Sequence, residues 1–167
     1  MIQTEVSTRR LRLAGFTLVE LMVVVAIATI LFAVAVPSYI SYIRQSRRTE
    51  ARTAVLDLAG REERFFSTNG AAYTSATANL GYTGAAFPVN VGTGYYAITV
   101  CVTTAPNTTP ACDPNANAPT HPAYYIVATP VTGQTQVNDT QCTAFAVDST
   151  GQQFATGTGG TAYCWSN

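Results

Sequence analysis

The chain has 167 residues, a formal net charge of zero and 47% hydrophobic residues, which leaves room for one domain. Its nine basic residues are all arginines, the last of them is Arg64, and the formal charges beyond it are Asp113, Asp139 and Asp148. The C-terminal part therefore lacks the basic patch that binds nucleic acid, and DNA binding through it is not expected.

The N-terminal region combines a basic flank with an apolar run. Arg9, Arg10 and Arg12 stand before residues 16–36, which as a helix would span about 31 Å, enough to cross the hydrocarbon core of a bilayer. The basic flank favours an N-terminus that stays in the cytoplasm. Glu20 lies inside the run, and an acid at mid-span costs roughly 2.5–3.5 kcal/mol, less near the interface. The segment predicts a membrane helix whose one acid needs a partner.

Residues 15–20 read GFTLVE, an apolar run follows, and residues 37–39 read PSY. This pattern behind arginines resembles the N-terminus of a type IV prepilin. The resemblance implies a leader that is cleaved between Gly15 and Phe16, and a mature chain that is methylated on the amine of Phe16. It also implies that Glu20 meets the N-terminal amine of a neighbouring subunit in the assembled fibre.

The same resemblance divides the chain into three segments. Residues 1–15 are the leader, residues 16–36 are the membrane or fibre-core helix, and residues 37–167 are the globular head, which includes the second half of the helix. The implied partners are other pilin subunits, a prepilin peptidase and methyltransferase, the assembly platform, and the bilayer before assembly. The protein is then expected in the bacterial inner membrane, with its head in the periplasm, and later in a pilus at the cell surface.

Other readings of the N-terminus remain. Ala33-Val34-Ala35 fits a signal-peptidase site, and a plain membrane anchor could let Glu20 reach the interface. Type II secretion pseudopilins share this N-terminus, and a tethered or secreted binding module is the alternative of another class. Within the family, the two cysteine pairs and the Cys164-Trp165 ending look more like a minor pilin than a secretion pseudopilin. A major pilin is the other alternative, and we expect a minor pilin because this kind of tail resembles that group.

Beyond Pro37, which is expected to bend the helix, apolar residues recur at spacings of three and four and predict an amphipathic helix to about Phe66. The apolar stripe consists of Ile40, Ile43, Ala51, Ala54, Val55, Leu58 and Phe65. The charged residues are expected on a solvated face, and they are Arg44, Arg48, Arg52, Asp57, Arg61 and Glu63. Asn69-Gly70 predicts the helix end.

Strand patterns begin after residues 71–90, which have no clear period and are interpreted as a surface connection. Alternating or β-branched runs at residues 94–102, 123–129, 142–148 and 152–155 predict three or four strands. Their short connections favour antiparallel pairing, and the apolar face of such a sheet needs the helix as its cover. The expected fold is α+β, with one long helix packed on a small antiparallel sheet.

Four cysteines in the expected head, Cys101, Cys112, Cys142 and Cys164, suggest disulfides in an oxidising compartment. Three pairings are possible, and we favour the two local ones, Cys101–Cys112 and Cys142–Cys164. The second resembles the disulfide-bounded C-terminal region of type IV pilins. A zinc site is disfavoured, because no pair has close metal-ligand spacing and His121 stands alone.

No catalytic constellation is visible in the sequence. The single histidine, His121, sits between prolines in an expected loop, and no G-x-S-x-G motif occurs. Residues 157–160 read GTGG without the lysine of a phosphate loop, which favours a flexible loop. We therefore expect no enzymatic activity, no cofactor and no metal.

Overall fold

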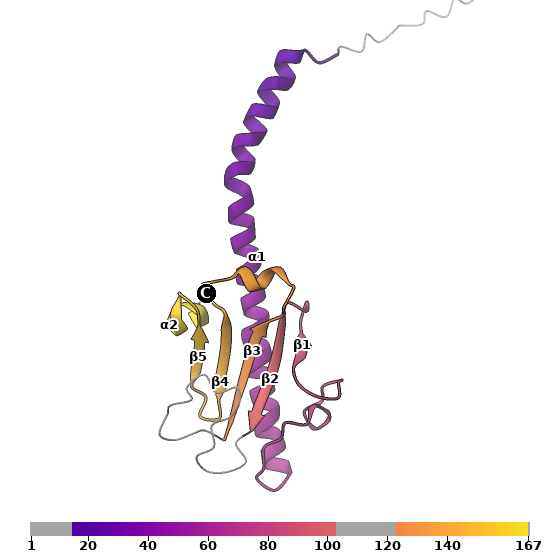
Figure 1. Cartoon of the computed structure of the whole chain (residues 1–167), viewed down its shortest axis with the longest axis vertical. Helices are drawn as coiled ribbons and strands as arrows, with labels where there is room; N and C mark the ends of the chain where they lie inside the picture. Colours follow the sequence, from indigo (N-terminus) through magenta and orange to yellow (C-terminus); the bar gives the residue numbers. More distant parts are fainter. Residues whose placement is uncertain (1–14, 103–122, 167) are drawn as a thin grey trace, which may run out of the picture. The chain divides into compact units, whose positions relative to one another are not determined.

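The computed structural model describes residues 15–102 and 123–166 (Figure 1). In chain order the elements are α1 (Leu18–Thr68), η1 (Thr77–Leu80), β1 (Val89–Val91), β2 (Tyr96–Val102), β3 (Tyr124–Pro130), η2 (Thr135–Asn138), β4 (Ala144–Asp148), β5 (Gln153–Thr156) and α2 (Gly160–Ser166). The chain divides into two compact units, Met1–Ile40 and Ser41–Asn167, and α1 supplies part of each.

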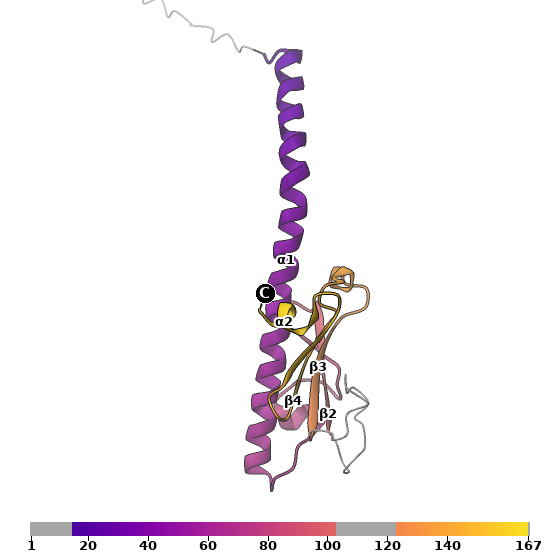
Figure 2. The same ribbon diagram turned by 90° about the vertical axis from the view of Figure 1, so that its left-hand side faces the viewer.

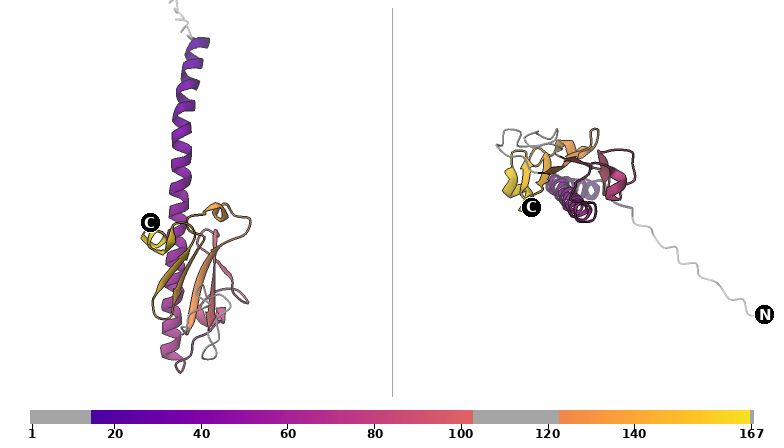
Figure 3. Two further views of the ribbon diagram at one scale, coloured as in Figure 1. Left: turned by 60° about the vertical axis from the view of Figure 1, so that its left-hand side comes forward. Right: turned by 90° about the horizontal axis from the view of Figure 1, so that it is seen from below.

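The second unit contains a five-stranded antiparallel sheet in the order β1-β2-β3-β4-β5. Each strand pairs with the next along the chain, for example Ile98 with Ala128 in β2 and β3, and Ala128 with Phe145 in β3 and β4. The part of α1 in this unit lies along one face of the sheet (Figures 2 and 3). The α+β prediction is confirmed.

The core lies between this part of α1 and the inner face of the sheet. Ala51, Val55 and Leu58 are fully buried, in agreement with the predicted stripe. They pack against the alternate residues of the strands that point toward the helix: Tyr96, Ile98, Val100, Tyr124, Ile126, Ala128, Phe145 and Val147. At roughly 1.5–3 kcal/mol for each large apolar side chain, this burial is the main force that holds helix and sheet together.

The structure adds detail to two stretches that the sequence predicts as loops. The connection at residues 71–90 contains η1 and most of β1, and β1 was missed because three residues are too short to show a period. The GTGG stretch forms a turn that leads into α2 at Gly160, and a Cβ at Gly157 would collide with the carbonyl oxygen of Gln141. Gly157 thus allows a close approach of two backbone segments.

Arg48 was expected on a solvated face, and this expectation was wrong. Its side chain is buried and binds Asp139 through two hydrogen bonds, Nε to Oδ2 at 2.7 Å and Nη2 to Oδ1 at 2.8 Å. The ion pair raises the pKa of the guanidinium, mainly through its hydrogen bond with the carboxylate. Because Arg48 lies three residues before Ala51, it sits on the same helix face as the apolar stripe, and that spacing was the available signal.

The pair is the centre of a buried polar cluster. Gln136 donates from Nε2 to the Tyr96 hydroxyl and to Asp139 Oδ2, both at 3.1 Å, and Arg48 Nη2 donates to Gln141 Oε1 at 3.0 Å. The cluster therefore connects α1 with β2, with η2 and with the segment that leads to β4. Gln136 Oε1 has no hydrogen-bond partner among the described residues, but the bidentate ion pair and the donors of Gln136 still favour one arrangement of the elements around them.

Glu62 marks the other end of the buried face. It is fully buried, its Oε2 accepts the Thr74 N–H at 3.1 Å, and its Oε1 has no partner among the described residues. Burial raises the pKa of this carboxyl to about 7, and the neighbouring Glu63 adds to the shift. Glu63 itself accepts hydrogen bonds from the hydroxyls of Tyr73 and Tyr124.

Replacing Arg48 with methionine should destabilise the protein by about 3–5 kcal/mol, because Asp139 would remain as an unpaired buried charge. Arg44→Met removes the same charge from the same helix at a position without a described ion pair, and should change stability by no more than about 0.5 kcal/mol. Urea denaturation of the full chain in detergent, followed by near-UV circular dichroism, measures both. Equal stability of the two variants would contradict the role of the pair.

Glu62 should make stability fall as pH rises from about 4.5 to about 7. The folded-state pKa lies above the ordinary value, so the folded protein binds more protons and loses stability as this carboxyl ionises. Glu62→Gln should flatten that slope and stabilise the protein at pH 8 by about 1–3 kcal/mol. Denaturation curves across this range test it, with Glu63→Gln as the control that removes only the smaller contribution of Glu63 to the pKa shift and keeps most of the slope. An unchanged slope in Glu62→Gln would show that Glu62 does not titrate there.

Candidate functional site

The first half of α1 presents apolar side chains around its whole circumference. Fourteen large apolar residues from Phe16 to Val36 are exposed, with exposed fractions that run from 83% at Phe16 to 51% at Val36. They are Phe16, Leu18, Val19, Leu21, Met22, Val23, Val24, Val25, Ile27, Ile30, Leu31, Phe32, Val34 and Val36. The helix contains a window of mean hydropathy 2.8 that is long enough to cross a membrane. Such a surface is stable only when lipid or other protein covers it.

The start of α1 has a defined cap. Thr17 directly precedes the helix, its Oγ1 accepts the Glu20 N–H at 3.2 Å, and its carbonyl accepts the Leu21 N–H at 3.2 Å. This is half of a capping box, in which a threonine and a glutamate stand three residues apart. Gly15 and Phe16 lie outside the helix and are exposed, so the peptide bond between them is not held in helical structure.

Glu20 lies in the first turn of α1, where the helix dipole favours a negative charge. Its side chain is exposed and has no ion pair within the described residues. One carboxylate thus stands in an otherwise apolar surface without a counter-charge. The geometry leaves it available to a cation from another molecule.

The C-terminal part of the head is closed by a disulfide between Cys142 and Cys164, the second of the two favoured pairings. Arg52 Nη1 donates to the Trp165 carbonyl at 2.8 Å, and Trp165 Nε1 donates to the Phe154 carbonyl at 2.8 Å. These contacts fasten the last turn of the chain to α1 and to β5.

Cys101 is also disulfide-bonded, whereas its expected partner Cys112 lies outside the described residues, as does His121. Residues 15–102 and 123–166 contain no group of three or more His, Cys, Asp or Glu side chains that could hold a metal.

Most arginines of the head are engaged by other groups. Arg48 pairs with Asp139, Arg61 pairs with Asp57 at 2.7 Å as the i, i+4 spacing predicts, and Arg47 lies over the Tyr95 ring. Residues 41–167 carry six arginines against seven acids, namely Glu50, Asp57, Glu62, Glu63, Asp113, Asp139 and Asp148. The head therefore has no excess of positive charge.

Two family comparisons cover most of the chain. Residues 10–36 match the prokaryotic N-terminal methylation motif. Residues 37–146 match the family described as type IV minor pilin ComP, DNA uptake sequence receptor. The first match falls on the apolar half of α1 and the second on the head, and together they support the minor pilin among the alternatives.

Similar proteins include the type IV major pilin protein PilA of Myxococcus xanthus, which is 47% identical over 53 residues, 32% of this chain and 24% of PilA. The fimbrial protein EcpC of Eikenella corrodens is 41% identical over 56 residues, 34% of this chain and 37% of EcpC. The chain thus matches only 24% of the length of PilA and 37% of the length of EcpC. The chain belongs to the type IV minor pilin ComP family.

Proposed function

We propose that the chain is a prepilin that is cleaved between Gly15 and Phe16, methylated on the Phe16 amine, and then incorporated into a pilus or used to prime its assembly. The observation that carries the proposal is the apolar surface of residues 16–36, which begins directly after an exposed, non-helical Gly15–Phe16 bond. The segments 1–15, 16–36 and 37–167 are then leader, membrane or fibre-core helix, and head.

The proposed path of the subunit from membrane to fibre follows from what can cover the apolar half of α1. Before assembly the bilayer covers it, with the N-terminus in the cytoplasm and the head in the periplasm. In the fibre, α1 of other subunits replaces the lipid. The proposed partners are a prepilin peptidase and methyltransferase, the assembly platform in the inner membrane, and other pilins of the same fibre.

Glu20 supplies the registry of that packing. A carboxylate beside the free amine of a neighbour's Phe16 offsets the desolvation of both groups, and it does so only at one displacement of the two helices. Buried ion pairs of this kind contribute more to specificity of register than to net stability in the best-attested cases.

The direct test is the intact mass and the N-terminal residue of the protein, taken from membrane and surface fractions. A start at Phe16 with one extra methyl group is the expected result. A start at Val36, or an uncut Met1, would mean that the helix does not enter a fibre, and the tethered or secreted binding module would replace this proposal.

Glu20→Ala should leave membrane insertion and folding intact and lower incorporation into fibres about tenfold, which corresponds to a loss of about 1.4 kcal/mol. Thr17→Val is the matched control, because it removes the cap of Glu20 but keeps the carboxylate, and should assemble better than Glu20→Ala. Quantifying the variant in sheared pili and in the membrane pool measures both. Normal incorporation of Glu20→Ala beside wild-type subunits would refute the registry role.

The description of the matched family includes the words DNA uptake sequence receptor. We nevertheless propose that the head of this chain does not bind DNA through electrostatic attraction. We also propose that the head has no enzymatic activity. The six arginines of residues 41–167 face seven acids, and no lysine or arginine follows Arg64. Mobility-shift titrations of the full chain in detergent with duplex DNA, at low and at physiological salt, should show no salt-sensitive complex. A complex that weakens steeply with salt would overturn this expectation.

A further inference from the structure

The antiparallel register gives the head two distinct ends. At one end of the sheet β2 begins, β3 ends, β4 begins and β5 ends. The residues of α1 that contact this end are arginines, because the guanidinium of Arg47 lies 3.4 Å from the centre of the Tyr95 ring and Arg48 binds Asp139. We call this part of the head the basic end.

Charged side chains are divided unevenly between the two ends. Those described at the basic end are Arg44, Arg47, Arg48, Arg52, Glu50 and Asp139. Four arginines thus accompany two acids, and Arg48 already neutralises Asp139. Those described at the opposite end, where β2 ends and β3 begins, are Glu62, Glu63, Arg64 and Asp148. The described part of the head is therefore positive at the basic end and negative at the other.

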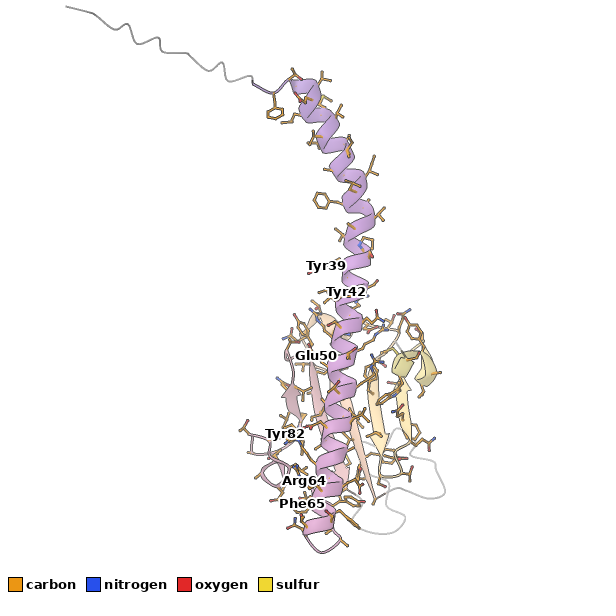
Figure 4. The ribbon with its side chains drawn as sticks, turned by 180° about the vertical axis from the view of Figure 1, so that it is seen from behind. Tyr39, Tyr42, Glu50, Arg64, Phe65 and Tyr82 are labelled. Atoms are coloured by element: carbon orange, nitrogen blue, oxygen red, sulfur yellow. A yellow bond between two sulfur atoms is a disulfide. The ribbon has the colours of Figure 1, made fainter. Side chains whose placement is uncertain are left out.

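Arg44 and Arg47 offer guanidinium donors at the basic end, and both residues are half-buried. Arg44 has no hydrogen bond, ion pair or ring contact within the described residues. Arg47 donates from Nη1 to Thr135 at 2.9 Å, which leaves most of its five N–H donors for another acceptor. Tyr42 is 69% exposed at the same end of the head, whereas Arg64 lies toward the other end (Figure 4).

The basic end is also the end at which the chain enters the head. The second unit begins at Ser41, three residues before Arg44, and the apolar run that can cross a membrane ends at Val36. Five residues cannot span more than about 18 Å even when they are fully extended. The covalent connection alone therefore keeps the basic end near a bilayer that holds the apolar run, whatever the angle between the two units.

We propose that the basic end of the head binds the phosphate groups of anionic phospholipids at the membrane surface. Arg44 and Arg47 are the donors, because the planar guanidinium matches the oxygens of a phosphate and can bind two of them at once. Tyr42 is the anchor at headgroup level, where tyrosines are enriched. The proposal deepens the proposed function and rests on its membrane stage before assembly.

The polarity of the head makes this contact directional. The acids at the opposite end are repelled by an anionic surface, so the basic end is the one that faces the lipid. An arginine near such a surface contributes about fivefold to binding, the factor that corresponds to about 1 kcal/mol, and salt screens the attraction. Two such residues hold a single subunit at the surface but leave it able to depart, and no second copy of the chain is needed.

Hydrogen exchange of the full chain in vesicles tests the contact. The vesicles contain phosphatidylcholine alone, or phosphatidylcholine and phosphatidylglycerol in equal parts. The amides of residues 92–95 and 131–141, which lie at the basic end, should exchange about fivefold more slowly with phosphatidylglycerol present. Arg44→Gln should remove most of this difference, and Arg44→Lys, which keeps the charge, should retain most of it.

Arg64→Gln is the matched control, because it removes the same charge from the same helix at the opposite end and should behave like wild type. The intact Cys142–Cys164 disulfide reports that each variant is folded. Equal exchange in the two kinds of vesicle, or an Arg44→Gln variant that behaves like wild type, overturns the contact. Slower exchange with duplex DNA added to phosphatidylcholine vesicles, and none with phosphatidylglycerol, assigns the arginines to another partner and also overturns it.

The failure of the proposed function looks different. A chain that stays in the soluble fraction and does not enter vesicles of either composition would overturn the proposed membrane stage, and this contact with it. A chain that inserts equally into both kinds of vesicle without a difference in exchange overturns the headgroup contact alone.

Discussion

The structure depends on one helix that meets two different environments. From Leu18 to Val36, α1 is apolar on all sides, and beyond Ser41 only one face is apolar and the sheet covers it. A helix that is apolar all round belongs in lipid or among other helices, whereas an amphipathic helix belongs on a domain surface. Because α1 is continuous, the head cannot fold without also presenting the apolar segment for coverage by lipid or by other subunits.

Two buried ionisable residues, Arg48 and Glu62, lie at the two ends of the buried face of α1 in the head. The cost of burying their charges is offset in different ways. Arg48 is satisfied by Asp139, whereas Glu62 keeps one oxygen without a described partner and responds with a raised pKa. A paired charge stays ionised and fixes the position of η2 and the residues after it. An unpaired buried carboxyl is best accommodated as a neutral acid. The ion pair therefore ties the helix to Asp139 near Arg48, while at the other end the raised pKa of Glu62 links its contact with Thr74 to the protonation of that carboxyl.

Much of this architecture could be predicted from the sequence because it depends on local patterns. The helix was expected over residues 16–66 and runs from Leu18 to Thr68, and the four predicted strands agree with β2 to β5 to within about two residues. These elements carry clear apolar periods and turn residues. Asp148 illustrates the turns, since its carboxylate accepts the N–H groups of Thr150 and Gln152.

What could not be predicted depends on contacts distant in sequence. The burial of Arg48 requires Asp139, which is 91 residues away, and no local pattern reports that distance. β1 is stabilised by its antiparallel pairing with β2 rather than by the strand propensity of its own three residues. α2 is held by the disulfide and by Arg52 on α1, although its glycine-rich start is a poor helix former.

The division of charge along α1 gives the final constraint on assembly. Apolar packing in a fibre core is nearly indifferent to sliding, because one apolar side chain replaces another as two helices shift. A stagger therefore has to be set by groups that tolerate only one partner position. In the apolar half of α1 the described residues offer one such group, the carboxylate of Glu20, which has no ion pair there. The proposed contact of Glu20 with the amine of a neighbouring subunit would set such a stagger without opposing the much larger energy of apolar burial.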